Sequence, residues 1–420
     1  MLEIKCKIFV LVHIKFNLIK EITHFDAVET EIESEGLYYL NFIVEERKCL
    51  FMLQYHCPDC GRLIGYKGLC WLCKADKKRT EALNLTKEEI EKMQQYCIEN
   101  VEKLNDMGEP ESTYFWNCLS YHHIISEELQ RAAVKKEVYY PYEIYYKAPE
   151  DVRDGLIDAL MNCTDAQTAG HLMGCLAMQG DDRALEVLFE LKKNPREWRK
   201  NLYVDSDFYA ELGGWTFDED RRRIQINYPK CYSLEKKISD DKAIVIGKIR
   251  EDTCPHCKGK LVDMLSIDTS DERLKFLEIN GKITVTCCPS CVMEAYPAAF
   301  GSYDFDGTGN AIFPYDGVAK QQEYCWNDAA YNELEKNELK LSYIERPIFF
   351  GANDWDIATI GGYAHWIQDC NIINCPDCKK PMRYLAQLPW DILTINGGDG
   401  SLYIEICPDC KKVSLHHQQT

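Results

Sequence analysis

The chain has 420 residues, of which 46% are hydrophobic and 28% are charged, a composition typical of a folded protein with more than one domain. Its formal net charge is −19 at pH 7, which disfavours phosphate backbones and anionic membrane surfaces as partners and favours basic proteins. We expect no membrane span, because no uncharged apolar run is long enough to cross a bilayer.

Residues 1–51 mix apolar and charged side chains without a clear period, and we interpret them as an N-terminal extension. Short strand signals occur at Tyr38–Leu40 and Phe42–Val44, and Met52 stands just before the first cysteine pair, where the core of the protein could begin. The first residues lack the cleavage site of a signal peptide, which a disulfide framework would require. We therefore predict a cytoplasmic protein with reduced cysteines.

Cysteine is unusually frequent, and its spacing favours metal over disulfides. Of 22 cysteines, twelve fall in six C-x-x-C pairs, and two such pairs can supply the four thiolates of a tetrahedral zinc site. The first two pairs lie nine residues apart within residues 52–79, which we predict to be a small zinc ribbon with these ligands: Cys57, Cys60, Cys70 and Cys73. Each pair, with a glycine close by, is typical of a knuckle whose backbone amides point at the thiolates. A module this small would depend on zinc for its folding energy.

Residues 80–223 are predicted to form a helical domain. A capping box at Thr86 and Glu89 begins its first helix, whose apolar face extends to Leu104. Further helices are expected at about 122–137, 150–162, 165–178 and 182–193. The last two resemble one unit of a HEAT-type array, although stacked neighbours are needed to bury the faces of such a unit. Gly213-Gly214-Trp215 marks the change to β-rich sequence.

Residues 224–420 are predicted to form a β-rich domain in which one cysteine pattern occurs twice. In the two copies a C-P-x-C pair is followed, after 30 and 28 residues, by a second pair. Asn280-Gly281 and Asn396-Gly397 are turn signals, and each leads into an alternating strand that ends at the second pair. We expect each copy to hold one structural zinc ion, with these ligands: Cys254, Cys257, Cys288 and Cys291 in the first copy, and Cys375, Cys378, Cys407 and Cys410 in the second.

Two alternatives concern these predicted metal sites. Cys287 stands beside Cys288, and His256 lies inside the preceding pair, so the choice of ligands in the first copy is open. Iron in a rubredoxin-like site would fit the same spacing. In either case a closed four-thiolate site has no open coordination position, so we expect it to stabilise the fold and not to catalyse a reaction.

The rest of the sequence offers no catalytic motif: it contains no P-loop, no dinucleotide fingerprint, no nucleophile elbow and no H-E-x-x-H. Asp304–Asn310 resembles the front of a calcium loop, but Tyr315 stands where the loop needs glutamate, which favours a plain turn. Basic runs at Lys74–Arg79 and Arg221–Arg223 are interpreted as solvated faces. We therefore predict neither an enzyme nor a nucleic-acid-binding protein, and no small-molecule substrate is evident.

The C-terminal part of the sequence resembles a known family. Ile360–Gln368, Leu385–Leu388, Gly398–Tyr403 and the last two cysteine pairs resemble the C-terminal signature of the YwqG-like family of bacterial proteins. The same order of segments is similar to that of eukaryotic programmed cell death protein 2. Ala364 stands where many relatives have proline. The resemblance covers about residues 150–420 and is specific over roughly the last 70.

This resemblance implies a non-enzymatic, β-rich binding domain. YwqG-like proteins have been proposed as immunity proteins of bacterial toxin systems, and the eukaryotic relatives as chaperones of a ribosomal protein. Either role could require an acidic surface that holds a basic protein, which the charge of −19 favours. We thus expect an α+β protein with an N-terminal zinc ribbon, a HEAT-like helical middle and a β-rich domain with two zinc sites. Its expected function is to neutralise a cognate toxin, and the alternative is a chaperone or a ribosome-associated or nucleic-acid-associated zinc-ribbon protein.

Overall fold

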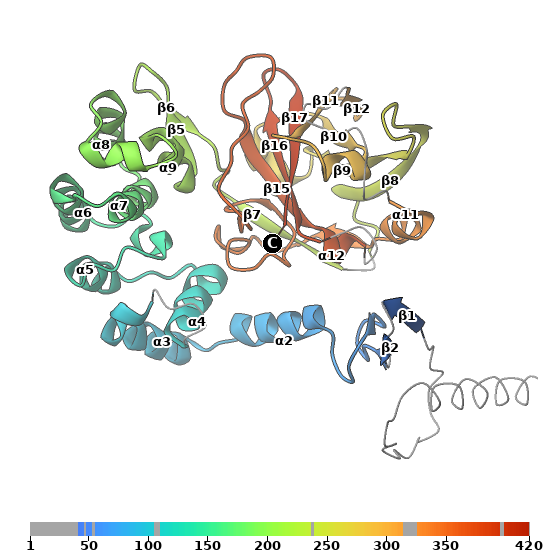
Figure 1. The fold of residues 1–420 in the computed structure, drawn as a ribbon, viewed down its shortest axis with the longest axis horizontal. Helices are drawn as coiled ribbons and strands as arrows, with labels where there is room; N and C mark the ends of the chain where they lie inside the picture. The colour runs from blue at the N-terminus through green and yellow to red at the C-terminus, as the bar shows by residue number, and fades with distance from the viewer. Residues whose placement is uncertain are drawn as a thin grey trace, which may run out of the picture. The chain divides into compact units, whose positions relative to one another are not determined.

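A computed structural model describes residues 41–45, 48–52, 55–104, 110–236, 239–313, 326–394 and 399–419, with only the backbone described before residue 55 (Figure 1). The chain divides into two compact units, Met1–Ala75 and Asp76–Thr420. The architecture is α+β as predicted, with helices in the middle of the chain and two main sheets after them. The predicted domain limits at residues 51, 79 and 223 stay predictions.

The described part of the N-terminal unit contains two hairpins and the start of a helix. β1 (Asn41–Glu45), which includes the predicted strand Phe42–Val44, pairs with β2 (Lys48–Met52), and β3 (Tyr55–His56) pairs with β4 (Leu63–Ile64). The strand signal at Tyr38–Leu40 lies outside the described residues. Helix α2 (Trp71–Leu83), which continues into the second unit, was not predicted from the sequence. A spacing of i and i+3 brings two cysteines together in a tight turn and equally on one face of a helix, so the C-x-x-C pattern does not separate the two.

The middle of the chain is helical, as predicted. Its α-helices are α3 (Lys87–Glu99), α4 (Pro110–Trp116), α5 (Glu127–Lys135), α6 (Glu150–Asn162), α7 (Ala166–Gln179), α8 (Asp182–Lys193) and α9 (Ser206–Leu212). The predicted capping box is confirmed: the Glu89 amide donates to the Thr86 hydroxyl, and the Thr86 amide donates to the Glu89 carboxylate at 2.8 Å. Shorter helical segments lie at Val101–Lys103, Asn117–Tyr121, Tyr142–Tyr145 and Glu197–Asn201.

Helices α6, α7 and α8 begin and end close to the predicted limits, whereas α5 begins later than the predicted residue 122. Its start is set by Ser126, whose hydroxyl accepts from the Leu129 amide at 3.1 Å. Helix α7 is buried over most of its length after the first turn, and its Leu172 and Leu176 share one core with Leu156 and Leu160 of α6. The HEAT-type interpretation of α7 and α8 stays a prediction.

The β-rich region contains a hairpin and two main sheets. The hairpin pairs β5 (Trp215–Phe217) with β6 (Arg223–Gln225). A three-stranded sheet has the order β10-β9-β8, with these bounds: β8 (Ile244–Thr253), β9 (Lys260–Asp268) and β10 (Lys282–Cys287). An eight-stranded sheet has the order β12-β11-β17-β16-β15-β14-β7-β13, with these bounds: β7 (Cys231–Lys236), β11 (Ala299–Tyr303), β12 (Gly309–Ile312), β13 (Leu339–Leu341), β14 (Thr359–Gly361), β15 (Arg383–Pro389), β16 (Ser401–Cys407) and β17 (Lys412–Gln418).

The two sheets share one apolar core. Leu402, Ile404 and Ile406 alternate along β16 and belong to the same buried cluster as Ile283 and Val285 of β10. Short helices complete this region: Glu272–Leu277, α10 (Pro289–Val292), α11 (Asp328–Glu335) and α12 (Trp390–Leu393). The shared core fixes the strands that carry the cysteine pairs.

The doubled cysteine pattern does recur in the structure, but its two copies lie in different sheets. In each copy a cysteine pair precedes a strand that pairs antiparallel with the strand ending at the second pair: β9 with β10, and β15 with β16. The chain then continues differently, into α10 after the first copy and into β17 after the second. The turn signal at Asn396-Gly397 lies outside the described residues. Asp304–Asn310 is a hairpin turn between β11 and β12, closed by the Asp304 amide donating to the Thr308 carbonyl at 2.8 Å.

Candidate metal centres

All twelve predicted ligands come together in three groups of four: Cys57, Cys60, Cys70 and Cys73; Cys254, Cys257, Cys288 and Cys291; and Cys375, Cys378, Cys407 and Cys410. Within each group the sulfur atoms all lie within 4.8 Å of one another. In the part of the chain that the structure describes, no further group of three or more His, Cys, Asp or Glu side chains is close enough to hold a metal ion. The six C-x-x-C motifs therefore combine as predicted, the first with the second, the third with the fourth and the fifth with the sixth.

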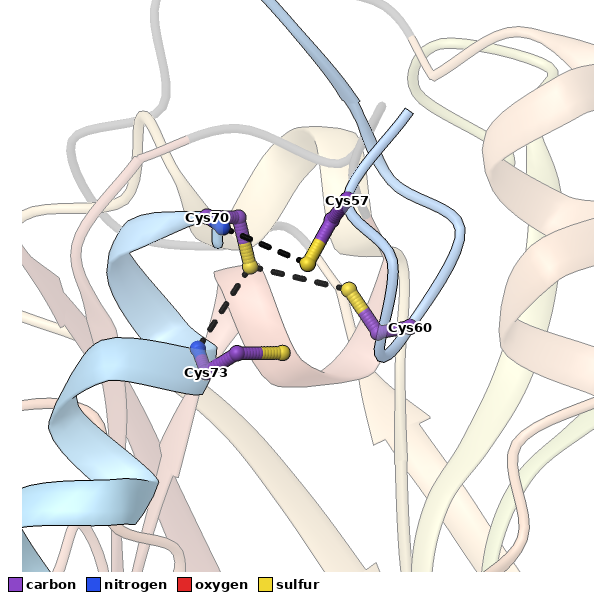
Figure 2. A group of neighbouring side chains, drawn as sticks. All are labelled: Cys57, Cys60, Cys70 and Cys73. Carbon is purple, nitrogen blue, oxygen red and sulfur yellow. Dashed lines mark hydrogen bonds between the residues drawn. The ribbon is translucent and has the colours of Figure 1, made fainter. Parts of the chain in front are cut away.

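The N-terminal group joins a hairpin turn to the first turn of a helix (Figure 2). Cys57 and Cys60 lie in the turn between β3 and β4, and Cys70 and Cys73 lie at the start of α2. The Cys70 amide donates to the Cys57 sulfur at 3.3 Å, and the Cys73 amide donates to the Cys70 sulfur at 3.4 Å. The Cys60 and Cys70 sulfurs are 3.6 Å apart. The second pair thus differs from the predicted knuckle, because a helix presents its two sulfurs.

The middle group joins the turn between β8 and β9 to the start of α10. The Cys254 sulfur lies 3.6 Å from that of Cys291, and the Cys257 sulfur lies 3.4 Å from that of Cys288. Cys287 is buried at the end of β10 but is not a member of the group. His256 lies beside the group, with its Nδ1 atom 3.8 Å from the Cys291 sulfur. The structure therefore selects Cys288 over Cys287 as the neighbour of the other three sulfurs.

The C-terminal group lies at one end of the β15–β16 pair. Cys375 and Cys378 precede β15, Cys407 ends β16, and Cys410 lies in the turn to β17. The Cys378 and Cys407 sulfurs are 3.8 Å apart. Met382 is fully buried against this group. The group therefore ties the β16–β17 turn to the segment that enters β15.

One turn geometry recurs in the first pair of every group. The amide of the first cysteine donates to the carbonyl five residues later, at 2.8 Å in Cys57, 2.7 Å in Cys254 and 2.8 Å in Cys375. The residue four positions after the first cysteine donates back to that cysteine and has a left-handed backbone: Gly61 (φ 72), Lys258 (φ 69) and Lys379 (φ 63). A side chain at such a φ costs about 1 kcal/mol, which a bound metal can offset. These positions were not predicted, although the glycine or lysine that follows the first C-P-x-C pair of each group was a usable signal.

The pKa values of the cysteines show how a cation would affect each group. Burial raises the pKa of Cys57, but amides of Cys70, Cys60 and Asp59 donate to its sulfur and the net effect lowers that pKa to about 6. Burial raises the pKa of Cys257 to about 11, and burial with neighbouring sulfurs raises the pKa of Cys407 further. Four adjacent thiols therefore cannot all ionise by themselves near neutral pH. A divalent cation makes four thiolates favourable, so binding would release protons.

The donor set limits what such a site can do. Four soft sulfur donors fit zinc or iron in tetrahedral geometry, and they exclude ions that require oxygen ligands. A site closed by four cysteines offers no position for water or substrate. These residues can therefore hold an ion and fix the surrounding chain, but they are not arranged to catalyse.

The basic run at Arg221–Arg223 is paired rather than free. Arg221 lies 3.5 Å from Glu186, Arg222 lies 3.8 Å from Asp218, and Arg223 lies 3.8 Å from Asp182. Arg223 also covers the ring of Trp215 at 4.3 Å from the centroid. These contacts agree with the interpretation of this run as a solvated face.

Comparison with known proteins gives little further guidance. No family model matches the chain, and no solved structure matches it. The chain is similar to the uncharacterized protein YpfL of Salmonella typhimurium, with 28% identity over 284 residues, which are 66% of this chain and 64% of YpfL. The match thus spans less than two thirds of the length of that relative. The resemblance to the YwqG-like family stays a prediction. No helix in the described segments is both long and apolar enough to cross a membrane.

Proposed function

We propose that the three cysteine groups hold zinc and that this protein is a zinc-stabilised binding protein that neutralises a cognate toxin. The observation that supports the zinc is the closed set of four sulfurs in each group. Zinc prefers this tetrahedral thiolate environment and has no redox chemistry that a buried structural site would need to control. Zinc rather than iron is thus the proposed ion, and metal analysis separates the two.

The negative charge supports a basic partner, and it is unevenly distributed. Residues 1–75 carry nine Lys and Arg against ten Asp and Glu, so residues 76–420 carry a net charge of −18. An acidic body steers basic proteins toward itself and repels nucleic acids. A basic toxin, such as a nuclease that itself binds phosphates, is the class of partner that this charge fits. Reduced thiolate sites are compatible with a cytoplasmic location, which is part of the proposal.

A capture and rescue experiment tests the binding role. Tagged full-length protein, isolated from its native host with metal retained, should recover a basic protein whose binding weakens steeply as salt increases. Co-expression with that protein should then restore growth that the partner alone abolishes. Recovery of a ribosomal protein without rescue would favour the chaperone alternative, and recovery of no protein partner would overturn the proposal.

A further inference from the structure

The short stretch of residues 55–75 carries an exposed aromatic face. Leu63, Tyr66 and Trp71 are 45%, 42% and 38% exposed. Within residues 55–75, Cys57 and Cys70 are the only fully buried side chains. Trp71 and Lys74 lie one turn apart on α2 and Lys74 contacts the Tyr66 ring, so the two rings lie on the same side of this stretch. Large apolar side chains exposed together mark an interaction surface.

Cations accompany these rings. The Lys74 ammonium lies 4.6 Å from the centroid of the Tyr66 ring, and the Arg62 guanidinium lies 6.0 Å from that of Trp71. Lys67 follows Tyr66 directly and is exposed. Among the described residues neither Lys67 nor Lys74 forms a salt bridge with a carboxylate. Their charges are thus available to an anionic ligand that can also use the rings.

The local charge differs from that of the whole chain. Residues 55–75 contain three cations, Arg62, Lys67 and Lys74, against the single carboxylate of Asp59. The remaining negative charge of a zinc-bound four-thiolate group is partly offset by amides that donate to its sulfurs, such as those of Cys70 and Cys73. At physiological salt, charges more than about 8 Å away are largely screened. The cations that a ligand on this face can reach within residues 55–75 are therefore Arg62, Lys67 and Lys74.

We propose that this face binds single-stranded nucleic acid, with bases stacked on Tyr66 and Trp71 and phosphates beside Lys67 and Lys74. Stacking does not depend on sequence, because every base has a flat face, and nearby cations suit the linking phosphates. Duplexes are disfavoured because their bases are already stacked and cannot reach the rings. An acidic peptide would use the lysines alone and gain nothing specific from two exposed rings. The net charge of the whole chain disfavours nucleic acid, whereas the cations within residues 55–75 favour it locally. Nucleic-acid binding at this face does not depend on the proposed toxin-binding role.

The test uses the zinc-loaded full-length protein and fluorescence anisotropy with labelled 12-nucleotide oligo(U) and oligo(dT). Binding should be detectable at 50 mM salt and should weaken roughly 7- to 18-fold by 200 mM salt, as expected for two to three phosphate contacts. Saturable binding of either oligonucleotide supports the proposal. Absence of binding to both at 50 mM salt overturns it, as does equal competition by a poly-glutamate peptide of the same charge.

Variants locate the site. Tyr66→Ala and Trp71→Ala should each weaken binding roughly 5- to 150-fold, whereas Trp71→Phe should retain most of it, because a ring remains. Lys67→Gln with Lys74→Gln should reduce the slope of log affinity against log salt by about 1.4. The matched control is Trp355→Ala, which removes a tryptophan that is 44% exposed in the other unit. Unchanged binding by the Tyr66 and Trp71 variants with full zinc content, or a loss with Trp355→Ala of the same size, would overturn the assignment.

Discussion

The N-terminal and C-terminal cysteine groups share one turn geometry but lie in regions with very different cores. Around Cys375 and Cys407, the strands β15 and β16 contribute fully buried apolar side chains to a core that two sheets share. Around Cys57 and Cys70, residues 55–75 bury no other side chain completely. The same four-sulfur arrangement therefore occurs both with an extensive apolar core and with almost none.

This difference indicates two roles for the same site. Where the described residues provide almost no core, a bound metal would supply much of the folding energy, which for structural zinc is about 10–16 kcal/mol. Where a core exists, burial stabilises the fold and the metal fixes the ends of strands. We therefore expect the two regions to respond differently when their sites are broken.

The largest effect should follow Cys70→Ser in the N-terminal group. Loss of one thiolate should unfold residues 55–75, because these residues bury only two cysteines completely, while Asp76–Thr420 should keep its own unfolding transition. Limited proteolysis with zinc analysis measures this: cleavage should appear within residues 55–75, and one zinc should be lost. Retained protease resistance in this segment would contradict the metal-dependent fold.

The next largest effect should follow Cys407→Ser in the C-terminal group. A broken site at the end of β16 leaves Cys375, which is buried, and the partly buried Cys378 and Cys410 without a cation, so we expect the C-terminal half to unfold or aggregate more readily, with a loss of several kcal/mol. The matched control is Cys287→Ser, a fully buried cysteine outside the groups, which should cost about 1 to 2 kcal/mol and retain all the metal. Thermal unfolding and zinc content check both variants, and equal stability of Cys407→Ser and the parent would argue against a structural site.

A third effect is a pH dependence of stability that concerns only the larger unit, Asp76–Thr420. Burial, with the nearby carboxylates of Asp207 and Glu405, raises the pKa of Glu211 from 4.5 to about 8, although the Ile372 amide opposes this. The folded protein thus keeps a proton that the unfolded chain releases, so stability from this group is complete below about pH 4.5 and is lost as pH rises through 8.

Glu211→Gln should remove this pH dependence. At pH 8 the variant should be more stable than the parent by roughly 4 kcal/mol, and the difference should shrink toward pH 5. Denaturant unfolding of the larger unit across this pH range measures it, with Glu128→Gln on the exposed surface of α5 as the matched control. A constant difference at all pH values would contradict the assignment to titration.

The smallest effect should follow Thr86→Ala, which removes the capping box of α3. The loss should be about 1 kcal/mol and should appear only in the transition of the larger unit. Thr80→Ala, an exposed threonine within α2, is the control and should change stability by less than about 0.5 kcal/mol. A loss of N-terminal zinc in the Thr86 variant would show that the two regions are coupled rather than separate.

The features that the sequence predicted are those set by local spacing. The capping box at Thr86 and the limits of α6 and α8 depend on residues close together in the chain, where periodicity is informative. The cysteine groups were predicted from the i, i+3 spacing within each pair and from the order of the pairs along the chain. Helix α2 was missed because its cysteine pair suits both a turn and a helix.

The features that were not predicted depend on distant parts of the chain. β11 pairs with β17, more than 100 residues later, and no local pattern specifies that register. The exposed face of Tyr66 and Trp71 was likewise not evident, because exposure depends on what packs against a side chain rather than on its type. The left-handed residues after the cysteine pairs, such as Lys379, became visible only from the backbone.

The most direct test of the account is the metal content of purified full-length protein, measured by mass spectrometry together with a count of free thiols. We predict three zinc ions per chain, one for each group of four reduced cysteines, with the N-terminal ion lost selectively in Cys70→Ser. A zinc content near zero, with the cysteines found in disulfides, would contradict the central claim that these groups are structural metal sites.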